Sequence, residues 1–441
     1  MNKASDLTEV AQIFDPQKVL TLADKDIHQD IYQSTINPLK MKLLINQIPS
    51  KTFFICGQIG MGKSTALNYL PDEKINNKFE VKYLTGRELF AIHDIDIIDI
   101  LLMIGFELIE DTCLEEKYYE GLNKLKDINL QNLKISKEQT WDFENNQEDK
   151  KEIGLKFDIL VSNFNGKIFK NLKMNERERQ SIREIFSIDK ANLIEFINDI
   201  ILDYKTDVMD NDKDLLLVID DLEKIVDKKI INKIFVEDNW VFHQINCVKI
   251  IPIHIFLPRS HSMFNNDLIE FDFRIEANKL EKNSDSSKAE KEVIDNIQTL
   301  KDLIKARLEN ESTISEEAYE DIIKYSGGNI RQLIEIIYQS AINQLTVSNF
   351  EGKVITVDDV AWGVGEISNR LSKMADSKIR VLSQIANKHK LFDEPTIQDL
   401  EDFDSLLLDN LIFLHKNGTH WYDVNPIIQK TVEVYGQSES N

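Results

Sequence analysis

The feature that most constrains the fold of this chain is a glycine-rich segment of eight residues, Gly57–Ser64, with the sequence GQIGMGKS. It follows an apolar run rich in β-branched and aromatic residues, Thr52–Cys56, and it opens a helical pattern that continues to about Leu70. Glycines at these spacings let successive backbone N–H groups point inward, and the positive end of the following helix favours an anion at the same place. The sequence therefore predicts a strand, a phosphate-binding loop and a helix in immediate succession.

The residues of this loop match the pattern G-x-x-x-x-G-K-[ST], in which each fixed residue type has a physical role. The glycines leave room for phosphate groups, Lys63 neutralises the β- and γ-phosphate charges, and the Ser64 hydroxyl coordinates Mg²⁺. The predicted ligands are therefore ATP and Mg²⁺, and the competing interpretation is a glycine turn that binds nothing. The residues expected to contact the nucleotide are Gly57, Gln58, Ile59, Gly60, Met61, Gly62, Lys63, Ser64 and Thr65.

Two carboxylates follow a second apolar run of strand length, Leu215–Ile219. A Walker B site requires this arrangement, in which a buried strand delivers an acid to its carboxyl end beside a phosphate-binding loop. Asp220 is predicted to hold Mg²⁺ together with Ser64, and Asp221 is predicted to orient the attacking water. Glu223 is an alternative to Asp221 in that second role, and its other interpretation is an ordinary glutamate in the first turn of a helix.

Alternating strand and helix patterns place the loop in a parallel sheet. Uninterrupted apolar strands with helices between them are typical of sheets covered on both faces, so the predicted class is α/β. A stretch at about 110–213 is longer than this core needs; its middle, 126–156, is predicted to be a flexible surface insertion, and its end, 176–204, to be helical. Further strands are predicted at Phe79–Leu84 and Val248–Leu257, and further helices at Lys25–Gln47, Ile95–Ile109, Lys291–Glu309, Ser315–Tyr325, Asn329–Gln344 and Val357–Ala375.

These motifs resemble those of AAA+ P-loop ATPases, in particular the branch that contains replication initiators of the origin-recognition type and the STAND signalling ATPases. The resemblance rests on Ile219–Lys224, IDDLEK, and on Tyr325–Leu333, YSGGNIRQL, which is similar to the sensor 2 signature of the family. It implies that Arg331, on a helical lid, reads the γ-phosphate, and that Lys63, Asp221 and Arg331 form the catalytic set. The other interpretation of Arg331 is a solvated helix cation.

One position departs from the family pattern. At the end of the strand predicted over Lys249–Leu257, where sensor 1 belongs, the chain has Pro258, Arg259 and Ser260 instead of a polar Asn or Thr. Arg259 is interpreted either as a sensor 1 substitute or as an arginine finger for a neighbouring subunit. Hydrolysis rate and ring formation therefore stay open. The resemblance covers roughly 25–362, and the predicted domains are a nucleotide-binding core at 1–285, a helical lid at 286–362 and a winged-helix-like domain at 363–441.

The predicted winged-helix-like domain combines helices at 378–388 and 396–415 with an Asn-Gly turn at Asn417 and an amphipathic segment that ends near Val434. Over 363–441 there are 8 Lys and Arg against 12 Asp and Glu, so contact with a protein is favoured over DNA readout. His415 and His420 are expected at the surface rather than as metal ligands, and Trp421 is expected to be a packing anchor.

Composition limits the class of protein. The formal net charge of −23 disfavours non-specific binding to nucleic acid and is compatible with protein partners. The apolar stretch at 95–109 is too short to span a bilayer and is interrupted by two aspartates, so no membrane association is predicted. Cys56, Cys113 and Cys247 lack metal-ligand spacing and are expected to be reduced thiols in the cytoplasm.

The function predicted from these features is that of an ATP-driven molecular switch with slow hydrolysis. The resemblance implies a bacterial regulatory or antiviral defence ATPase that controls a protein effector or associates with itself. The alternatives are a DNA-associated AAA+ regulator of the replication-initiator or transposition type, which needs a basic surface, a nucleotide or polynucleotide kinase, and a scaffold that binds ATP without turnover.

Overall fold

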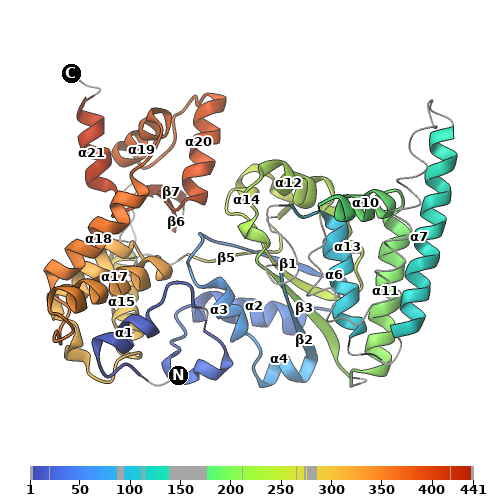
Figure 1. Ribbon diagram of the computed structural model, residues 1–441, viewed down its shortest axis with the longest axis horizontal. Coiled ribbons are helices and arrows are strands. Elements are labelled where there is room, and N and C mark those ends of the chain that lie inside the picture. The colour runs from blue at the N-terminus through green and yellow to red at the C-terminus, as the bar shows by residue number, and fades with distance from the viewer. Residues whose placement is uncertain are drawn as a thin grey trace. The chain divides into compact units, whose positions relative to one another are not determined.

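The computed structural model describes residues 3–18, 20–86, 94–110, 112, 115–138, 176–210, 212–264, 266–272, 275, 286–417 and 419–438. The chain forms two compact units (Figure 1). The first unit contains 1–41, 55–70 and 253–441, and the second contains 42–54 and 71–252. The predicted insertion residues 139–156 and Cys113 lie outside the described residues.

A five-stranded sheet has the order β2-β3-β4-β1-β5. The β2–β3 and β3–β4 pairs are parallel, with Phe79 opposite Asp214 and Leu216 opposite Val248. Strand β3 is buried from Leu215 onward, as expected for a strand covered on both faces. The bounds are β1 (Thr52–Cys56), β2 (Phe79–Thr85), β3 (Asp214–Asp220), β4 (Val248–Pro252) and β5 (Leu268–Glu270).

The helices of the second unit begin at polar caps and bury apolar faces. Asp96 caps α6 and forms a capping box with Asp99, and Asp189 caps α11. Arg183 of α10 binds Asp99 and Asp94, which ties α10 to the start of α6. The bounds are α4 (Glu73–Lys78), α6 (Ile97–Ile109), α7 (Glu115–Glu138), α10 (Glu176–Ser187), α11 (Lys190–Asp207), α12 (Lys228–Asn232) and α13 (Asn239–Gln244).

The first unit contains the glycine loop and the long helical part of the chain. Its α15, α16, α17 and α18 follow the predicted helices closely, and Gly327 ends α16 in a left-handed conformation. The helix predicted from Lys25 begins later, because His28 is extended and separates a 3-10 turn at Leu22–Ile27 from α2. The bounds are α1 (Leu7–Ile13), α2 (Gln33–Ile45, shared between the units), α3 (Lys63–Asn68), α14 (Leu257–Ser260), α15 (Ser286–Lys305), α16 (Glu316–Ser326), α17 (Ile330–Val347) and α18 (Val357–Leu371).

The C-terminal part of the first unit has the predicted order of helices, hairpin and closing helix. The predicted helix 396–415 was too long: α20 ends at Leu408, Asn410 takes a left-handed φ of 56°, and a strand begins at Ile412. In this segment apolar residues at strand spacing were mistaken for a continuation of the helix. The bounds are α19 (Asp376–Lys388), α20 (Ile397–Leu408), β6 (Ile412–Asn417), β7 (Thr419–Val424) and α21 (Gln429–Ser438).

The fold class predicted from the sequence is confirmed: a parallel α/β sheet with the glycine loop after β1, a helical segment, and a C-terminal helix-and-hairpin segment. Two further details were wrong. Residues 126–138 continue α7, with Lys126 only 3% exposed, and β4 ends at Pro252 instead of Leu257. Among the described residues, no helix is long and apolar enough to cross a bilayer.

Candidate nucleotide-binding site

The glycine loop connects β1 directly to α3, as the sequence predicts. Gly62 is the N-cap of α3 and has a φ of 82°, which a residue with a side chain rarely adopts. Gly60 has a φ of 90°, and a Cβ atom there would lie 2.6 Å from Oδ1 of Asn329 and 2.9 Å from Cβ of Arg331. Glycine at position 60 is therefore required both by the backbone and by a close neighbour.

Lys63 lies inside the loop rather than in solvent. Its side chain is 4% exposed, and Nζ donates hydrogen bonds to the carbonyl oxygens of Gly57 at 2.9 Å and Gln58 at 3.0 Å. Phosphate oxygens are stronger acceptors for an ammonium group than backbone carbonyls are. A buried cation held by loop carbonyls beside the N-terminus of α3 fits a phosphate ligand, with Ser64 and Thr65 in the first turn of that helix.

The outer carbonyls of the loop are bound by residues far away in the sequence. The Ile59 oxygen accepts from Nδ2 of Asn329 at 2.8 Å and from Nδ2 of Asn410 at 2.9 Å. The Gly60 oxygen accepts from the backbone N–H of Arg331 at 2.9 Å. These bonds hold the tip of the loop between the start of α17 and the segment that follows α20.

Asn329 has two roles at the start of α17. Its Oδ1 caps the helix by accepting from the backbone N–H of Gln332, and its Nδ2 donates to Ile59. One side chain thus joins the sensor 2 segment to the glycine loop. The structure brings Arg331, named from the sequence as the γ-phosphate reader, against Gly60 of the loop.

Buried side-chain amides extend this connection into the C-terminal segment. Gln332 and Asn425 exchange two hydrogen bonds of 2.8 and 2.9 Å, and Asn425, fully buried, also donates to the Asn410 carbonyl. Gln58 of the loop donates from Nε2 to the Ile412 carbonyl at 2.6 Å. We call Gln58, Asn329, Gln332, Asn410 and Asn425 the amide network.

Gln58 was among the nucleotide contacts predicted from the sequence, but the amide network as a whole was not predicted. Asn329 and Gln332 lie in the quoted sensor 2 segment, whereas Asn410 and Asn425 carried no motif. One signal was available: an asparagine directly after a helix often takes the left-handed conformation that Asn410 has.

The two predicted Walker B acids lie at the end of β3 in the second unit. Asp220 and Asp221 are 6% and 4% exposed. Asp221 has a φ of 72°, its backbone N–H donates to Oδ1 of Asp220, and its carboxylate forms an ion pair with Lys224. Left-handed residues other than glycine are uncommon and cluster at functional sites, and aspartate is among the residue types that adopt this conformation most readily.

Glu223, the alternative acid, is also buried, at 4% exposure, in a 3-10 turn at Leu222–Lys224. It is therefore not a solvated helix glutamate. The pKa of Tyr83 on the neighbouring β2 is raised by burial and then by the Asp220 carboxylate. Asp220, Asp221 and Glu223 thus form a compact buried acidic group at the end of β3.

Arg259 occupies a different place from the one expected. Because β4 ends at Pro252, residue 259 lies in the short helix α14 rather than at the end of a strand. Its guanidinium lies 4.8 Å from the ring centre of Phe403 and 5.0 Å from that of Tyr422, both in the C-terminal segment. Arg259 is therefore part of the packing of the first unit through cation–π contacts.

The β6–β7 hairpin corrects one prediction and supports another. His415 is buried rather than at the surface, with its ring 4.4 Å from that of Trp421. Trp421 is fully buried, as its predicted packing role requires. His420 is 40% exposed, and its Nε2 lies 3.5 Å from Glu270.

Comparisons with known proteins add only distant likenesses. No protein-family model and no curated protein matches the sequence. Among solved structures, Cdc6p from Pyrobaculum aerophilum matches with 13% identity and a TM-score of 0.40, over 97% of this chain and 98% of that one. A Walker-type ATPase of Pyrococcus abyssi matches with 12% identity and a TM-score of 0.44, over 96% and 99% of the chains. The Aeropyrum pernix ORC1 protein, solved in complex with DNA, matches with 10% identity and a TM-score of 0.40, over 98% and 96%.

Proposed function

We propose that this chain is an AAA+-type ATPase that acts as a nucleotide-controlled switch on a protein partner. The observation that carries the proposal is the pair of amide donors, Asn329 and Asn410, on the Ile59 carbonyl of the glycine loop. When Nζ of Lys63 binds a phosphate ligand, it releases the carbonyl oxygens of Gly57 and Gln58. The conformation of the loop then changes, and Asn329 and Asn410 are both hydrogen-bonded to that loop. Nucleotide binding is thereby coupled to the lid helix α17 and to the C-terminal segment.

In this proposal each site residue keeps the role that its chemistry suits. The loop residues 57–65 hold the phosphates of ATP, Ser64 and Asp220 hold Mg²⁺, and Arg331 senses the γ-phosphate. Asp221 orients the attacking water, and Glu223 is the alternative for that step. The partner reads the arrangement of the C-terminal segment, and the chain works in the cytoplasm, in bacterial regulation or genome defence.

The experiment measures ligand binding and the response of the chain separately. Titration calorimetry with Mg²⁺ and ATP should give heat for the wild type and little for Lys63→Ala. Hydrogen exchange should then change at 329–333 and 410–425 when ATP replaces ADP, since local opening depends on the bonds that hold each segment. Binding without any change in exchange at these segments would leave an ATP-binding protein but remove the switch.

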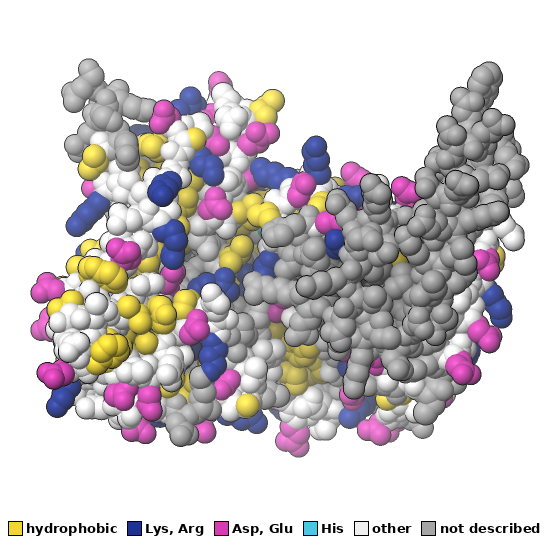
Figure 2. Space-filling model, viewed as in Figure 1, with side chains coloured by type: hydrophobic (Ala, Val, Ile, Leu, Met, Phe, Trp, Pro, Cys, Tyr) yellow, Lys and Arg dark blue, Asp and Glu magenta, His cyan; other side chains and the backbone are white. Residues whose placement is uncertain are grey.

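A DNA-associated regulator is the second candidate, and the charges oppose it. Helix α20, one of the helices available to the C-terminal segment for contact with a groove, contains four acidic residues and no Lys or Arg. On the face shown in Figure 2, cations and anions are interspersed, and the described residues form no continuous basic surface. Retention of duplex DNA on filters at low salt, dependent on ATP, would favour this second candidate.

A scaffold that keeps ATP without turnover is the third candidate. The ion pair between Lys224 and Asp221 favours it, because a carboxylate bound by an ammonium group is a weaker base for water. Phosphate release measured for the wild type, Lys63→Ala and Asp221→Ala separates a scaffold from an ATPase. Equal release from all three proteins shows the absence of genuine turnover.

A further inference from the structure

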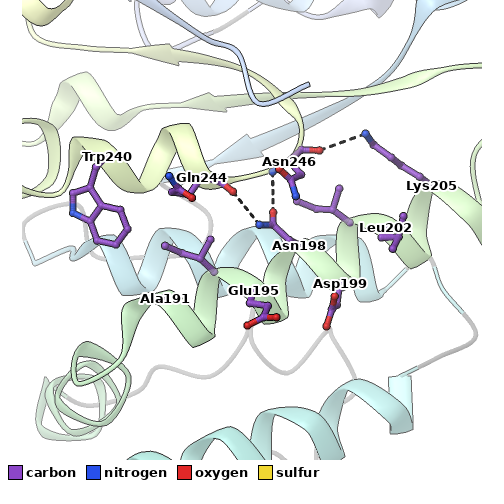
Figure 3. Close-up of a pocket in the computed structure, with 11 residues that line it drawn as sticks. Ala191, Glu195, Asn198, Asp199, Leu202, Lys205, Trp240, Gln244 and Asn246 are labelled. Atoms are coloured by element: carbon purple, nitrogen blue, oxygen red, sulfur yellow. Dashed lines mark hydrogen bonds between the residues drawn. The ribbon is translucent and has the colours of Figure 1, made fainter. Parts of the chain in front are cut away.

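An open groove runs between α11 and α13 in the second unit and encloses about 410 Å³ (Figure 3). All of its lining residues belong to 191–205 and 240–246, so it contains none of the residues assigned to ATP. A volume near the lower end of the range for small-molecule pockets suits a few anchoring side chains.

The two walls of the groove are fixed to each other by hydrogen bonds. Nδ2 of Asn198 on α11 donates to the Gln244 carbonyl at 2.9 Å, and its Oδ1 accepts from the backbone N–H of Asn246 at 2.8 Å (Figure 3). Nζ of Lys205 also donates to the Asn246 carbonyl. The groove is therefore preformed, and a ligand does not have to order it on binding.

Large apolar side chains are exposed at the groove. Trp240 on α13 is 45% exposed and Leu202 on α11 is 62% exposed. Tryptophan is among the residues that contribute most to binding energy at protein interfaces, because it buries a large rigid surface. The groove thus offers an aromatic contact toward one end and an aliphatic contact toward the other to apolar side chains of a partner (Figure 3).

The rim along α11 is acidic. Glu195 and Asp199 are exposed and are one helical turn apart, and Lys117 of α7, which binds Asp203, also interacts electrostatically with Asp199. Such a rim repels phosphate backbones and attracts ammonium or guanidinium groups. The net charge of −23 for the whole chain acts in the same direction over longer distances.

We propose that this groove docks a basic amphipathic segment of a partner protein. Two apolar side chains of that segment pack on Trp240 and on Leu202, which lie toward opposite ends of the groove (Figure 3), and lysines or arginines one turn apart pair with Glu195 and Asp199. This is helix-in-groove recognition, in which apolar anchors give affinity and flanking charges give orientation. The groove gives the switch a place to hold its partner that is separate from the ATP residues.

A synthetic helical peptide of about 18 residues, or five turns, serves as the probe. It carries leucines on one face and lysines on the flanks, with a fluorescent label, and a second peptide has glutamate in place of each lysine. Fluorescence anisotropy gives Kd for the wild type, Trp240→Ala and the double variant Glu195→Lys/Asp199→Lys. Matched controls are Trp362→Ala, at an exposed tryptophan of α18, and Glu317→Lys/Asp321→Lys, an acidic pair at the same spacing on α16.

The proposal expects Trp240→Ala to weaken binding of the lysine peptide at least about tenfold, as loss of a central tryptophan does at other interfaces. Charge reversal on α11 should weaken the lysine peptide by a similar factor and create binding of the glutamate peptide. Both controls should stay within about twofold, because they change groups that are far from the groove in sequence and leave its charge intact.

Several results would overturn it. These are no binding of the lysine peptide to the wild type, equal binding by every variant, or an equal loss in the controls. Loss of single-stranded DNA binding in Trp240→Ala would instead assign the groove to nucleic acid. The Lys63→Ala variant should keep full affinity for the lysine peptide, so failure of the ATP site and failure of the groove give different results.

Discussion

The glycine loop and the acidic group at the end of β3 obtain their polar partners in opposite ways. The Ile59 carbonyl of the loop is bound by side chains 270 and 351 residues away in the sequence. Asp221 instead pairs with Lys224, three residues later, and with its neighbour Asp220. The loop is thus bound by side chains at the start of α17 and in the C-terminal segment, whereas the ion pair with Lys224 and the hydrogen bond to Asp220 that Asp221 makes are both within three residues of it. Distant substitutions should consequently change nucleotide affinity more than they change the chemistry at Asp221.

Asp221→Asn tests the local half of this comparison and has the largest expected effect. Phosphate release should fall by at least about 100-fold, the usual contribution of a positioned general base. Affinity for ATP and Mg²⁺ should stay within about threefold, because Asp220 is unchanged and asparagine tolerates the left-handed backbone at 221. A coupled phosphate assay and calorimetry give the two numbers. If Glu223→Gln abolishes release and Asp221→Asn does not, Glu223 is the acid.

Lys63→Ala tests whether the glycine loop binds the phosphates of ATP. In the proposed function this buried ammonium group binds the phosphates, so its removal should cost about 2–3 kcal/mol of binding free energy, or roughly 30- to 150-fold in Kd. Calorimetric titration with Mg²⁺ and ATP measures it, and thermal unfolding shows whether the apo protein is intact. Lys74→Ala, at an exposed lysine of α4, is the control and should bind normally.

Asn425→Ala tests the distant half of the comparison. The substitution removes the donor to Oε1 of Gln332 and to the Asn410 carbonyl, while Nε2 of Gln332 keeps its bond to the Tyr325 carbonyl, so the free energy of unfolding should fall by about 2 kcal/mol. Because Asn410 also holds Ile59, ATP affinity should change several-fold although residue 425 is outside the loop. Urea unfolding and calorimetry measure both. Asn387→Ala, which removes one exposed bond within α19, should change neither.

Gly60→Ala and Gly365→Ala form a matched pair. A Cβ at 60 meets Asn329 and Arg331 and has an unfavourable φ, so stability should fall by about 1–2 kcal/mol and α17 should lose contact with the loop. A Cβ at 365, in α18, meets no atom within 4 Å, so that alanine should raise stability by up to about 1 kcal/mol. If both substitutions change the free energy of unfolding equally, the close approach of the loop to α17 does not explain the effect of Gly60→Ala.

Substitution of Lys249 in β4 has the smallest expected effect, which is a change in how the free energy of unfolding depends on pH. Its side chain is buried and donates to the Ile245 and Cys247 carbonyls, and burial lowers its pKa to about 8 from 10.5. Between these values the unfolded chain binds more protons, so the free energy of unfolding should rise with pH, by at most about 1.4 kcal/mol per pH unit. Below pH 8 the lysine is protonated in both states and adds no slope. Urea unfolding of wild type and Lys249→Met at pH 7 and 9 should show the rise in the wild type alone.

Most of the fold could be predicted because local patterns are strong in this chain. The bounds of β1 and the start of α3 follow from an apolar run and a glycine loop, and Gly327 marks the end of α16 through its left-handed backbone. The prediction was wrong where two local patterns compete, as at 396–415, where a helix gives way to a strand. It was also wrong about the place of Arg259, which lies in a short helix instead of at a strand end, and about the exposure of His415, since aromatic partners that bury or bind a side chain leave no periodic signal.

The sequence by itself determined the strand–loop–helix unit, the acid pair after β3 and the Gly327–Asn329 start of helix α17, because each requires particular residue types at neighbouring positions. Only the tertiary structure decided that side-chain amides of Asn329 and Asn410 meet on one carbonyl of the loop, and that Trp240 and Leu202 flank one groove. These features join side chains that are distant in the chain. Their meeting depends on how whole helices and strands pack, and no local pattern encodes that packing.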